Sequence, residues 1–542
     1  MTQTTKAVWR QALGPAWELQ LVFFGLCLFA AGATVPLADP DLPIHLATGE
    51  WVMKNRSVPF TEPWAWTRPN APFFAYSWAI ETLYYLILVG VGPIGLHLLQ
   101  GLTYVALGAS ILVLGQVSGW RPWTTIVIAA THLIVTLGAT PFLRPQAILL
   151  IATPLVWALV LRARDVERLR WELPALTLVS AAVANTHLLF PLTAAPCVLL
   201  LTRLPERRRR LVLIPLAIVV GWFLTPYAVH WVDTYRLYFA PNALLSPPTP
   251  IAEYKPGFTM ALTAGVSSLL VCFGLLVLPW LVGARYDVRE RALYGFLWLA
   301  GFTMFALAVR GLVVWWLLVI PCAALAVEAL PEPSLATVRT AQRGLVLAIF
   351  AAVGMLAVEE ARDPSLRAGS VTTRFLPSMN ARAIEPIAEW LDCNVRKSVG
   401  GRLVTTFNYG GYVPWRLPYL SESIDGRTFF PDSVAKAETY FRPNQAAIPL
   451  PPWKTADLAI LPVGVPLAGV LDTAAGWRRV AITSQLEGRA SMIGLWVTDR
   501  WWLRAGNGTL APGLLPLPHR FDREHACPAP SATTELERSN DE

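Results

Sequence analysis

The stretch "LVFFGLCLFAAGATVPLADPDLPIHLATGEW" (residues 21–51) passes from a continuous apolar run into two aspartates and a histidine. Together with the residues before it, the apolar part has about the 20 residues that a helix needs to cross a bilayer. Asp39, Asp41 and His45 therefore stand where the chain first leaves hydrocarbon. Ionisable side chains near a membrane are costly and usually face a cavity or one another. The stretch predicts a helical membrane protein with a polar site at the exit of its first span.

The composition of the whole chain agrees with that expectation. Of its 542 residues 54% are hydrophobic and 15% are charged, and the mean hydropathy is +0.47. Soluble domains carry about 25% charged residues, so we expect an α-helical polytopic membrane bundle. The chain has a net charge of +8, and its basic residues cluster in short loops between apolar runs. Such clusters set membrane orientation, and we expect no nucleic-acid partner.

About twelve apolar runs recur before residue 359, several of them at or below the usual spanning length. They lie near 17–37, 76–91, 94–116, 122–140, 146–162, 173–185, 188–202, 211–229, 258–283, 292–309, 311–330 and 344–358. Three domains follow from this pattern. Residues 1–358 form the transmembrane domain, with a first external loop at 38–75. Residues 359–505 alternate in short runs between turn signals and predict a small α/β domain. Residues 506–542 are proline-rich and then acidic, which predicts a disordered tail.

Basic loops set the expected orientation of these runs. Arginine clusters at 162–170, 203–210, 284–292 and 338–343 are predicted to be cytoplasmic, as is the N-terminus. The chain after about residue 359 then lies outside the cytoplasm. One run must fail to cross, because three crossings between 38–75 and 142–146 would put the second segment on the wrong side. We predict that this run is 76–91, which is short and contains Glu81.

The first external loop itself has two predicted parts. Ile44, Ala47, Trp51 and Val52 recur at helical spacing and predict a short amphipathic helix on the outer membrane surface. The proline-rich residues 58–73 predict an ordered loop.

Unusual polar residues collect on the side that this orientation map calls external. One outward-facing wet cavity would explain them together. They are Asp39, Asp41, His45, Glu81, Arg144, Gln146, Asn185, His187, Tyr227, His230, Glu253, Tyr254, Lys255 and Arg310.

Each of these residues also has a purely structural interpretation. Asp41 precedes a predicted helix and suits its N-cap, and Asp39 before a proline suits a turn. Asn185 and His187 could satisfy the end of a broken helix, and the arginines could neutralise lipid phosphates. The six cysteines show no metal-ligand spacing, and a bridge between Cys393 and Cys527 in the C-terminal third stays open.

Several stretches resemble a known family. Residues 39–78, "DPDLPIHLATGEWVMKNRSVPFTEPWAWTRPNAPFFAYSW", look like the first external loop of bacterial membrane proteins in the GT-C glycosyltransferase superfamily. "RPQ" at 144–146, "NTH" at 185–187 and "NYGGYVPWRLPYLSESIDGRTFF" at 408–430 are similar to it as well. The chain departs from the family where "LPIHL" replaces a more aromatic "WWHL" type and where "EYKPG" (253–257) replaces an "EW" pattern.

The resemblance implies an inner-membrane enzyme of the bacterial cell envelope with a periplasmic C-terminal domain. Its donor would be a sugar on polyprenyl phosphate, and its acceptor an unidentified glycan, lipid or protein. Asp39 or Asp41 would act as the base or as a metal-organising carboxylate. The chemistry is independently sensible, because a carboxylate can deprotonate an acceptor hydroxyl and Arg144, Lys255 and Arg310 suit the donor phosphate. Asp39, Asp41 and His45 stay open as ligands of a divalent ion such as Mg²⁺ or Mn²⁺.

Two other functions fit the same observations. A transporter or flippase of lipid-linked sugars would also gather polar groups at a cavity, although the sequence shows no internal repeat. A non-catalytic assembly protein for cell-envelope polysaccharide would use its C-terminal domain to bind a partner. If the protein is an enzyme, Asp41→Asn and Asp39→Asn are expected to fold normally and to lose transfer.

Overall fold

The computed structural model describes helices and strands along most of the chain. The described residues are 17–34, 37, 39, 41–139, 143–166, 169–238, 288–307, 311–331, 334, 379–406, 409–423, 452–483, 492–506 and 515–517. The helices of the N-terminal part are α2 (Trp17–Thr34), α3 (Leu42–Asn55), α4 (Trp78–Val91), α5 (Pro93–Ser118), α6 (Pro122–Ala139), α7 (Gln146–Asp165), α8 (Glu172–Ala184), η1 (Phe190–Arg203), α9 (Leu204–Phe223), η2 (Ala228–His230), α10 (Trp231–Tyr238), α14 (Val288–Leu307) and α15 (Gly311–Glu328).

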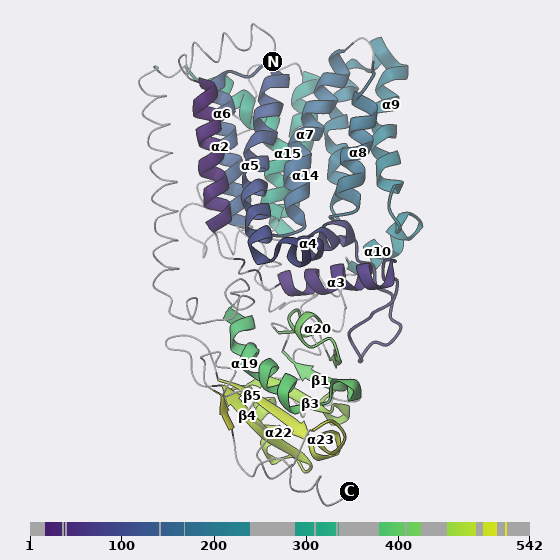
Figure 1. Cartoon of the computed structure of the whole chain (residues 1–542). Helices are drawn as coiled ribbons and strands as arrows, with labels where there is room; N and C mark the ends of the chain where they lie inside the picture. Colours follow the sequence, from purple (N-terminus) through teal and green to yellow (C-terminus); the bar gives the residue numbers. More distant parts are fainter. Residues whose placement is uncertain are drawn as a thin grey trace, which may run out of the picture.

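Most of these helices run side by side as a bundle (Figure 1). Helices α5, α7 and α15 are each long and apolar enough to cross a membrane. Within the described ranges, a fourth span results if Val212–Phe223 of α9 and the segment Ala228–Tyr238 are counted together, although the chain bends by 99° between them. Small residues let the helices approach closely: a Cβ at Gly32 of α2 would lie 2.8 Å from the Cα of Gly101 on α5. The predicted helical bundle is confirmed in this part of the chain.

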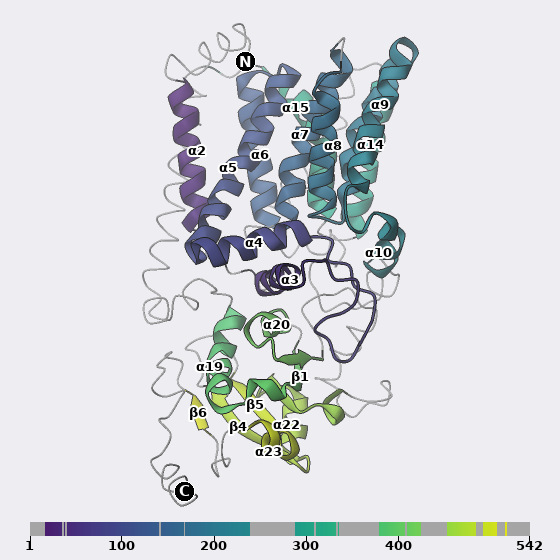
Figure 2. The same ribbon diagram turned by 45° about the vertical axis from the view of Figure 1, so that its right-hand side comes forward.

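Helices α3 and α4 depart from the bundle direction. Both lie crosswise beneath its lower end, between the bundle and the C-terminal domain (Figures 1 and 2). The predicted amphipathic helix is α3, and its apolar residues Ile44, Ala47 and Val52 are buried. Helix α4 corresponds to the run at 76–91, which we expected not to cross with the others. Its crosswise course agrees with the count of basic loops.

The C-terminal domain is a mixed sheet with helices. Its elements are α19 (Met379–Asn394), η4 (Lys397–Val399), β1 (Gly401–Thr405), α20 (Val413–Arg416), β2 (Leu420–Glu422), η5 (Pro452–Thr455), β3 (Leu458–Pro462), α22 (Pro466–Thr473), β4 (Trp477–Thr483), β5 (Ile493–Thr498), α23 (Asp499–Ala505) and β6 (Leu515–Leu517). The strand order is β2-β1-β3-β5-β4-β6. Strands β1, β2 and β3 pair in parallel, whereas β5 is antiparallel to β3 and β4.

Strand β6 and Cys393 bear on two predictions about the C-terminal third. Strand β6 pairs in parallel with β4, with Ala481 opposite Leu515. The sheet therefore extends beyond the predicted domain boundary at 505, and the prediction of a disordered tail is wrong for 515–517. A three-residue strand among prolines is too short to be seen as a period-two pattern. Cys393 on α19 is disulfide-bonded, while Cys527 lies outside the described residues.

The loop between α3 and α4 ties the C-terminal sheet to the bundle. Ala65 forms a parallel bridge with Glu422 at the end of β2, so the loop adds a short edge to the sheet. The indole Nε1 of Trp66 donates to the carbonyl of Leu403 at 3.2 Å, and the Thr67 hydroxyl donates to the carbonyl of Ser423 at 2.7 Å. These contacts hold the sheet close beneath α3, where α20 also packs.

Candidate functional site

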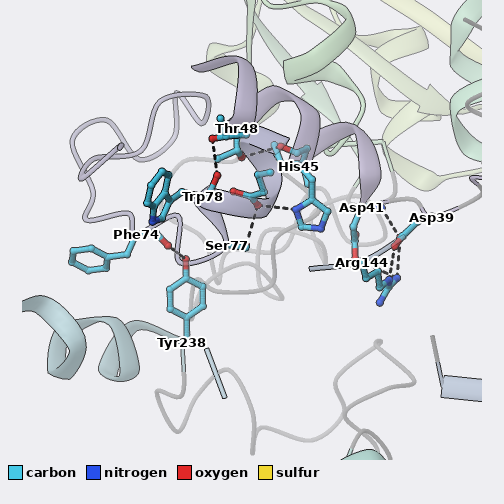
Figure 3. A network of polar contacts seen from close by, with 12 residues as sticks. Asp39, Asp41, His45, Thr48, Phe74, Ser77, Trp78, Arg144 and Tyr238 are labelled. Carbon is cyan, nitrogen blue, oxygen red and sulfur yellow. Dashed lines mark hydrogen bonds and ion pairs between the residues drawn. The ribbon is translucent and has the colours of Figure 1, made fainter. Parts of the chain in front are cut away.

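The candidate site lies where α3 begins, beside the start of α7. Asp39 is 1% exposed, and its carboxylate forms a fork with the Arg144 guanidinium, with Nη2 at 2.9 Å from Oδ1 and Nε bonded to Oδ2 (Figure 3). Oδ1 also accepts the backbone N–H of Asp41 at 3.0 Å. That bond across two residues is the turn that an aspartate before proline was expected to make. Asp39 therefore anchors both Arg144 and the backbone of Asp41.

Asp41 has a different environment from Asp39. Its side chain is 38% exposed, and its Oδ2 lies 3.4 Å from Nη2 of Arg144. Asp41 occupies the N-cap position of α3, but its side chain makes no capping hydrogen bond. The interpretation of Asp41 as a cap is therefore wrong. Helix α3 starts without that help because Pro43 in its first turn has a preset φ and no N–H to satisfy.

The two carboxylates of this cluster contact the guanidinium of Arg144 in different ways. Asp39 forms a fork with it, whereas Asp41 lies 3.4 Å from one of its nitrogens. A fork with a buried carboxylate is among the strong polar contacts in proteins. Asp41 is therefore the more loosely held and more exposed carboxylate of the two.

A second polar contact links α3 to α4. Nδ1 of His45 lies 2.7 Å from Oε1 of Glu81, and the Ser77 hydroxyl donates to the same oxygen at 3.1 Å. Glu81 is 5% exposed. Burial lowers the pKa of His45, but its hydrogen bond and charge interaction with Glu81, together with the charges of Asp41 and Asp39, outweigh burial and raise the pKa above its ordinary value. His45 therefore favours the imidazolium form more than an isolated histidine does.

Gly49 explains how α3 and α4 come close enough for this contact. A Cβ on Gly49 would overlap the carbonyl oxygen of Glu81 and would lie 2.8 Å from Cβ of Tyr85. Real Cβ atoms do not come that close to backbone atoms. The glycine is thus required where the two crosswise helices meet, one turn after His45. Ser77 and Gly49 were not predicted as site residues. The only sequence signal for the contact between Ser77 and Glu81 is their spacing of four residues.

Asn185 and Tyr227, which we expected to line a cavity, bind neighbouring backbone and side-chain groups. Asn185 Oδ1 accepts the indole N–H of Trp78 at 2.8 Å, and its Nδ2 donates to the carbonyls of Ala181 and Leu224. The buried Tyr227 hydroxyl accepts the N–H of Ala75 and donates to the carbonyl of Pro59. Both residues fasten loop ends to the bundle, as the structural interpretation of Asn185 expected.

The other predicted residues are spread around this region. His187 Nδ1 accepts the N–H of Leu189 at 3.0 Å, which closes a local turn. His230 stacks on Phe74 with ring centroids 5.6 Å apart, and Gln146 is the first residue of α7. Glu253, Tyr254, Lys255 and Arg310 lie outside the described residues. The described part of the site thus centres on Asp39, Asp41, Arg144, His45 and Glu81.

The described residues do not fit a metal site. Over the described ranges, no group of three or more His, Cys, Asp or Glu side chains is arranged to hold a metal ion. Both oxygens of Asp39 are engaged by Arg144, and His45 Nδ1 faces Glu81. The geometry therefore does not assemble Asp39, Asp41 and His45 as the open ligand set, and no step below uses a metal.

Comparison with known proteins gives a likeness of fold. No protein-family model and no curated protein matches the sequence. The oligosaccharyltransferase of Archaeoglobus fulgidus in its apo form matches with a TM-score of 0.50 at 11% identity, over 82% of this chain and 69% of that chain. ArnT from Cupriavidus metallidurans bound to undecaprenyl phosphate has a TM-score of 0.48 at 14% identity, over 90% of this chain and 99% of that chain. The likeness to the oligosaccharyltransferase is one of fold: over 82% of its length the chain shares the overall fold of that structure.

Proposed function

We propose that this protein is a membrane glycosyltransferase that moves a sugar from a polyprenyl-phosphate donor to an acceptor on the periplasmic side. The observation that carries the proposal is the arrangement of the two aspartates. A buried Asp39–Arg144 fork fixes the start of α3, while the Asp41 carboxylate beside it is 38% exposed. Such a fixed, accessible carboxylate suits the removal of a proton from an acceptor hydroxyl.

The reaction follows from the charges of the site. The Asp41 carboxylate takes the proton of the acceptor hydroxyl while the hydroxyl oxygen forms a bond to C1 of the donor sugar. The bond between C1 and the phosphate oxygen breaks, and its electron pair stays on the lipid phosphate. Arg144 lies 3.4 Å from Asp41 and holds its side chain in place. Because Asp39 already balances the charge of Arg144, Arg144 is not sufficient as the partner of the donor phosphate. Lys255 and Arg310 remain the proposed partners of the donor phosphate.

The position of the site supports a lipid-linked donor. Asp41 directly precedes α3, and α3 lies crosswise between the end of the bundle and the C-terminal domain (Figure 2). The count of basic loops assigns this end to the periplasmic side. A flipped polyprenyl phosphate would present its head group at that level, within reach of the start of α3.

Replacement of Asp41 tests the proposal. Asparagine keeps the shape of aspartate and removes its charge, so Asp41→Asn should lower transfer by about 10²-fold or more, the scale of acid–base catalysis. The assay is sugar transfer from a polyprenyl-phosphate donor by the full chain reconstituted in vesicles, with protein amount measured in parallel. Glu50→Gln is the matched control, because Glu50 is another α3 carboxylate, paired on the helix surface with Lys54 at 2.6 Å. If wild type transfers the sugar and Asp41→Asn transfers it equally fast, the assignment of the base is wrong.

A further inference from the structure

His45 of α3 and Glu81 of α4 form a second pair of a basic and an acidic side chain, close to Asp41. His45 follows Asp41 by four residues on α3, and side chains at that spacing lie on one side of a helix with Cβ atoms about 5–6 Å apart. Figure 3 shows the imidazole of His45 beside Asp41, with Arg144 beyond it. The proposed reaction has so far used neither His45 nor Glu81.

The contact with Glu81 fixes which nitrogen of His45 is available. An ionised carboxylate only accepts hydrogen bonds, so Nδ1 of His45 must carry the proton in the 2.7 Å contact with Oε1. Nε2 then points away from Glu81 and is the nitrogen that can exchange a proton with a substrate. The side chain of His45 is 17% exposed.

Glu81 is built to balance a charged imidazole. Its side chain is 6% exposed, and Ser77 on the preceding turn holds its Oε1 from a second direction. Among the described residues its other oxygen, Oε2, is buried without a hydrogen-bond partner. Burying a carboxylate is costly unless a cation is paired with it. His45 is the basic side chain that contacts it.

We propose that His45 is the general acid of the transfer, which gives its Nε2 proton to the lipid phosphate as the phosphate leaves, and that Glu81 is its positioning residue. The inference rests on the proposed function. When the bond between C1 and the bridging oxygen breaks, the oxygen keeps the electron pair and takes the proton of His45. Asp41 meanwhile holds the proton of the acceptor hydroxyl. Transfer of that proton from Asp41 to the neutral His45 restores both residues, so the proton of the acceptor ends on the released lipid phosphate.

Negative charge around the ring supports the acidic role. Asp39, Asp41 and Glu81 all favour the protonated form of His45, and Arg144 is the opposing cation at the same corner. A phosphate leaving group also needs positive charge or a proton, because negative charge develops on its oxygen in the transition state. Since Asp39 already matches Arg144, the imidazolium of His45 supplies what the described part of the site otherwise lacks.

A sulfur-bridged donor separates the acid from a structural residue. Sulfur in place of the oxygen between C1 and phosphorus leaves readily without a proton, so that donor does not need a general acid. We expect His45→Gln to slow transfer from the oxygen donor by about 10²-fold and transfer from the sulfur donor by less than about threefold. Asp41→Asn should slow both donors, because the acceptor still needs a base.

Two further variants complete the test. Glu81→Gln should show the same pattern as His45→Gln to a smaller degree, and the double variant should be no slower than His45→Gln alone. Equal losses on both donors in His45→Gln and in Glu81→Gln would overturn the proposal, as would unchanged rates on the oxygen donor. If the wild-type protein transfers sugar from neither donor, the proposed function is refuted instead. The failure of this inference and the failure of the proposed function are therefore distinguishable.

Discussion

Asp39 and Asp41 are two residues apart in the sequence, but their side chains have different environments. Asp39 is buried with Arg144 in a fork, whereas the Asp41 side chain is 38% exposed. Removing one partner of a buried ion pair leaves the other charge uncompensated and costs about 3–5 kcal/mol. The proposed chemistry therefore rests on Asp41, whereas we expect the stability of this part of the site to rest on Asp39.

Substitution of Asp39 should show this division of roles. We expect Asp39→Asn to lower the free energy of unfolding by about 3 kcal/mol, because Arg144 loses its buried partner. Asp41→Asn should change it by less than about 0.5 kcal/mol, the usual range for an exposed side chain. Thermal unfolding of the two purified variants, followed by tryptophan fluorescence, measures the difference. Equal stabilities would contradict the separate roles of the two aspartates.

The sequence alone could not separate these residues. Both aspartates fit the start of a helix equally well, and the sequence-based expectation that both asparagine variants fold normally is now revised for Asp39. The deciding partner, Arg144, is 105 residues away in the chain. Local spacing carries no information about such a contact. The pairing of His45 with Glu81 was hidden for the same reason, since 36 residues separate them.

The two crosswise helices, α3 and α4, position the residues of the site. Helix α4 ends at Gly92, whose φ of 81° is a conformation that glycine adopts without strain, and α5 starts at Pro93. This turn sends the chain from the crosswise direction of α4 into the bundle (Figure 1). The existence of α3 and α4 was predictable from periodicity and from the count of basic loops. Their close approach was not, because it depends on the absence of a Cβ at Gly49.

Gly49→Ala should therefore damage the site without touching any charged group. The added methyl group would overlap the backbone of Glu81, so the helices must separate, at a cost of about 1–3 kcal/mol. Separation moves Glu81 away from His45, and a shift of about 1 Å costs about 10²-fold in rate. Gly90→Ala on α4 is the matched control, because no atom lies within 4 Å of its added Cβ. Comparable transfer rates for the two alanine variants would show that the close approach is irrelevant to function.

In the molecule as a whole, the loop between α3 and α4 joins two domains that are far apart in sequence. Thr67 and Ser423 are separated by 356 residues and meet in one hydrogen bond. The helical bundle and the small sheet domain were each predictable from hydropathy and alternation. Their junction was not, because the loop supplies an irregular edge at Ala65 rather than a patterned strand. The junction places the C-terminal domain directly below the start of α3 (Figure 1).

We propose that a lipid-linked sugar is consumed at this junction. Full-length protein in vesicles, with a labelled sugar on polyprenyl phosphate supplied on the side of the C-terminal domain, allows the sugar transferred and the lipid phosphate released to be counted together. We expect one lipid phosphate for each sugar transferred, with little product when the donor is confined to the opposite leaflet. Movement of intact donor between leaflets without release of lipid phosphate would identify a flippase and refute the proposed transfer.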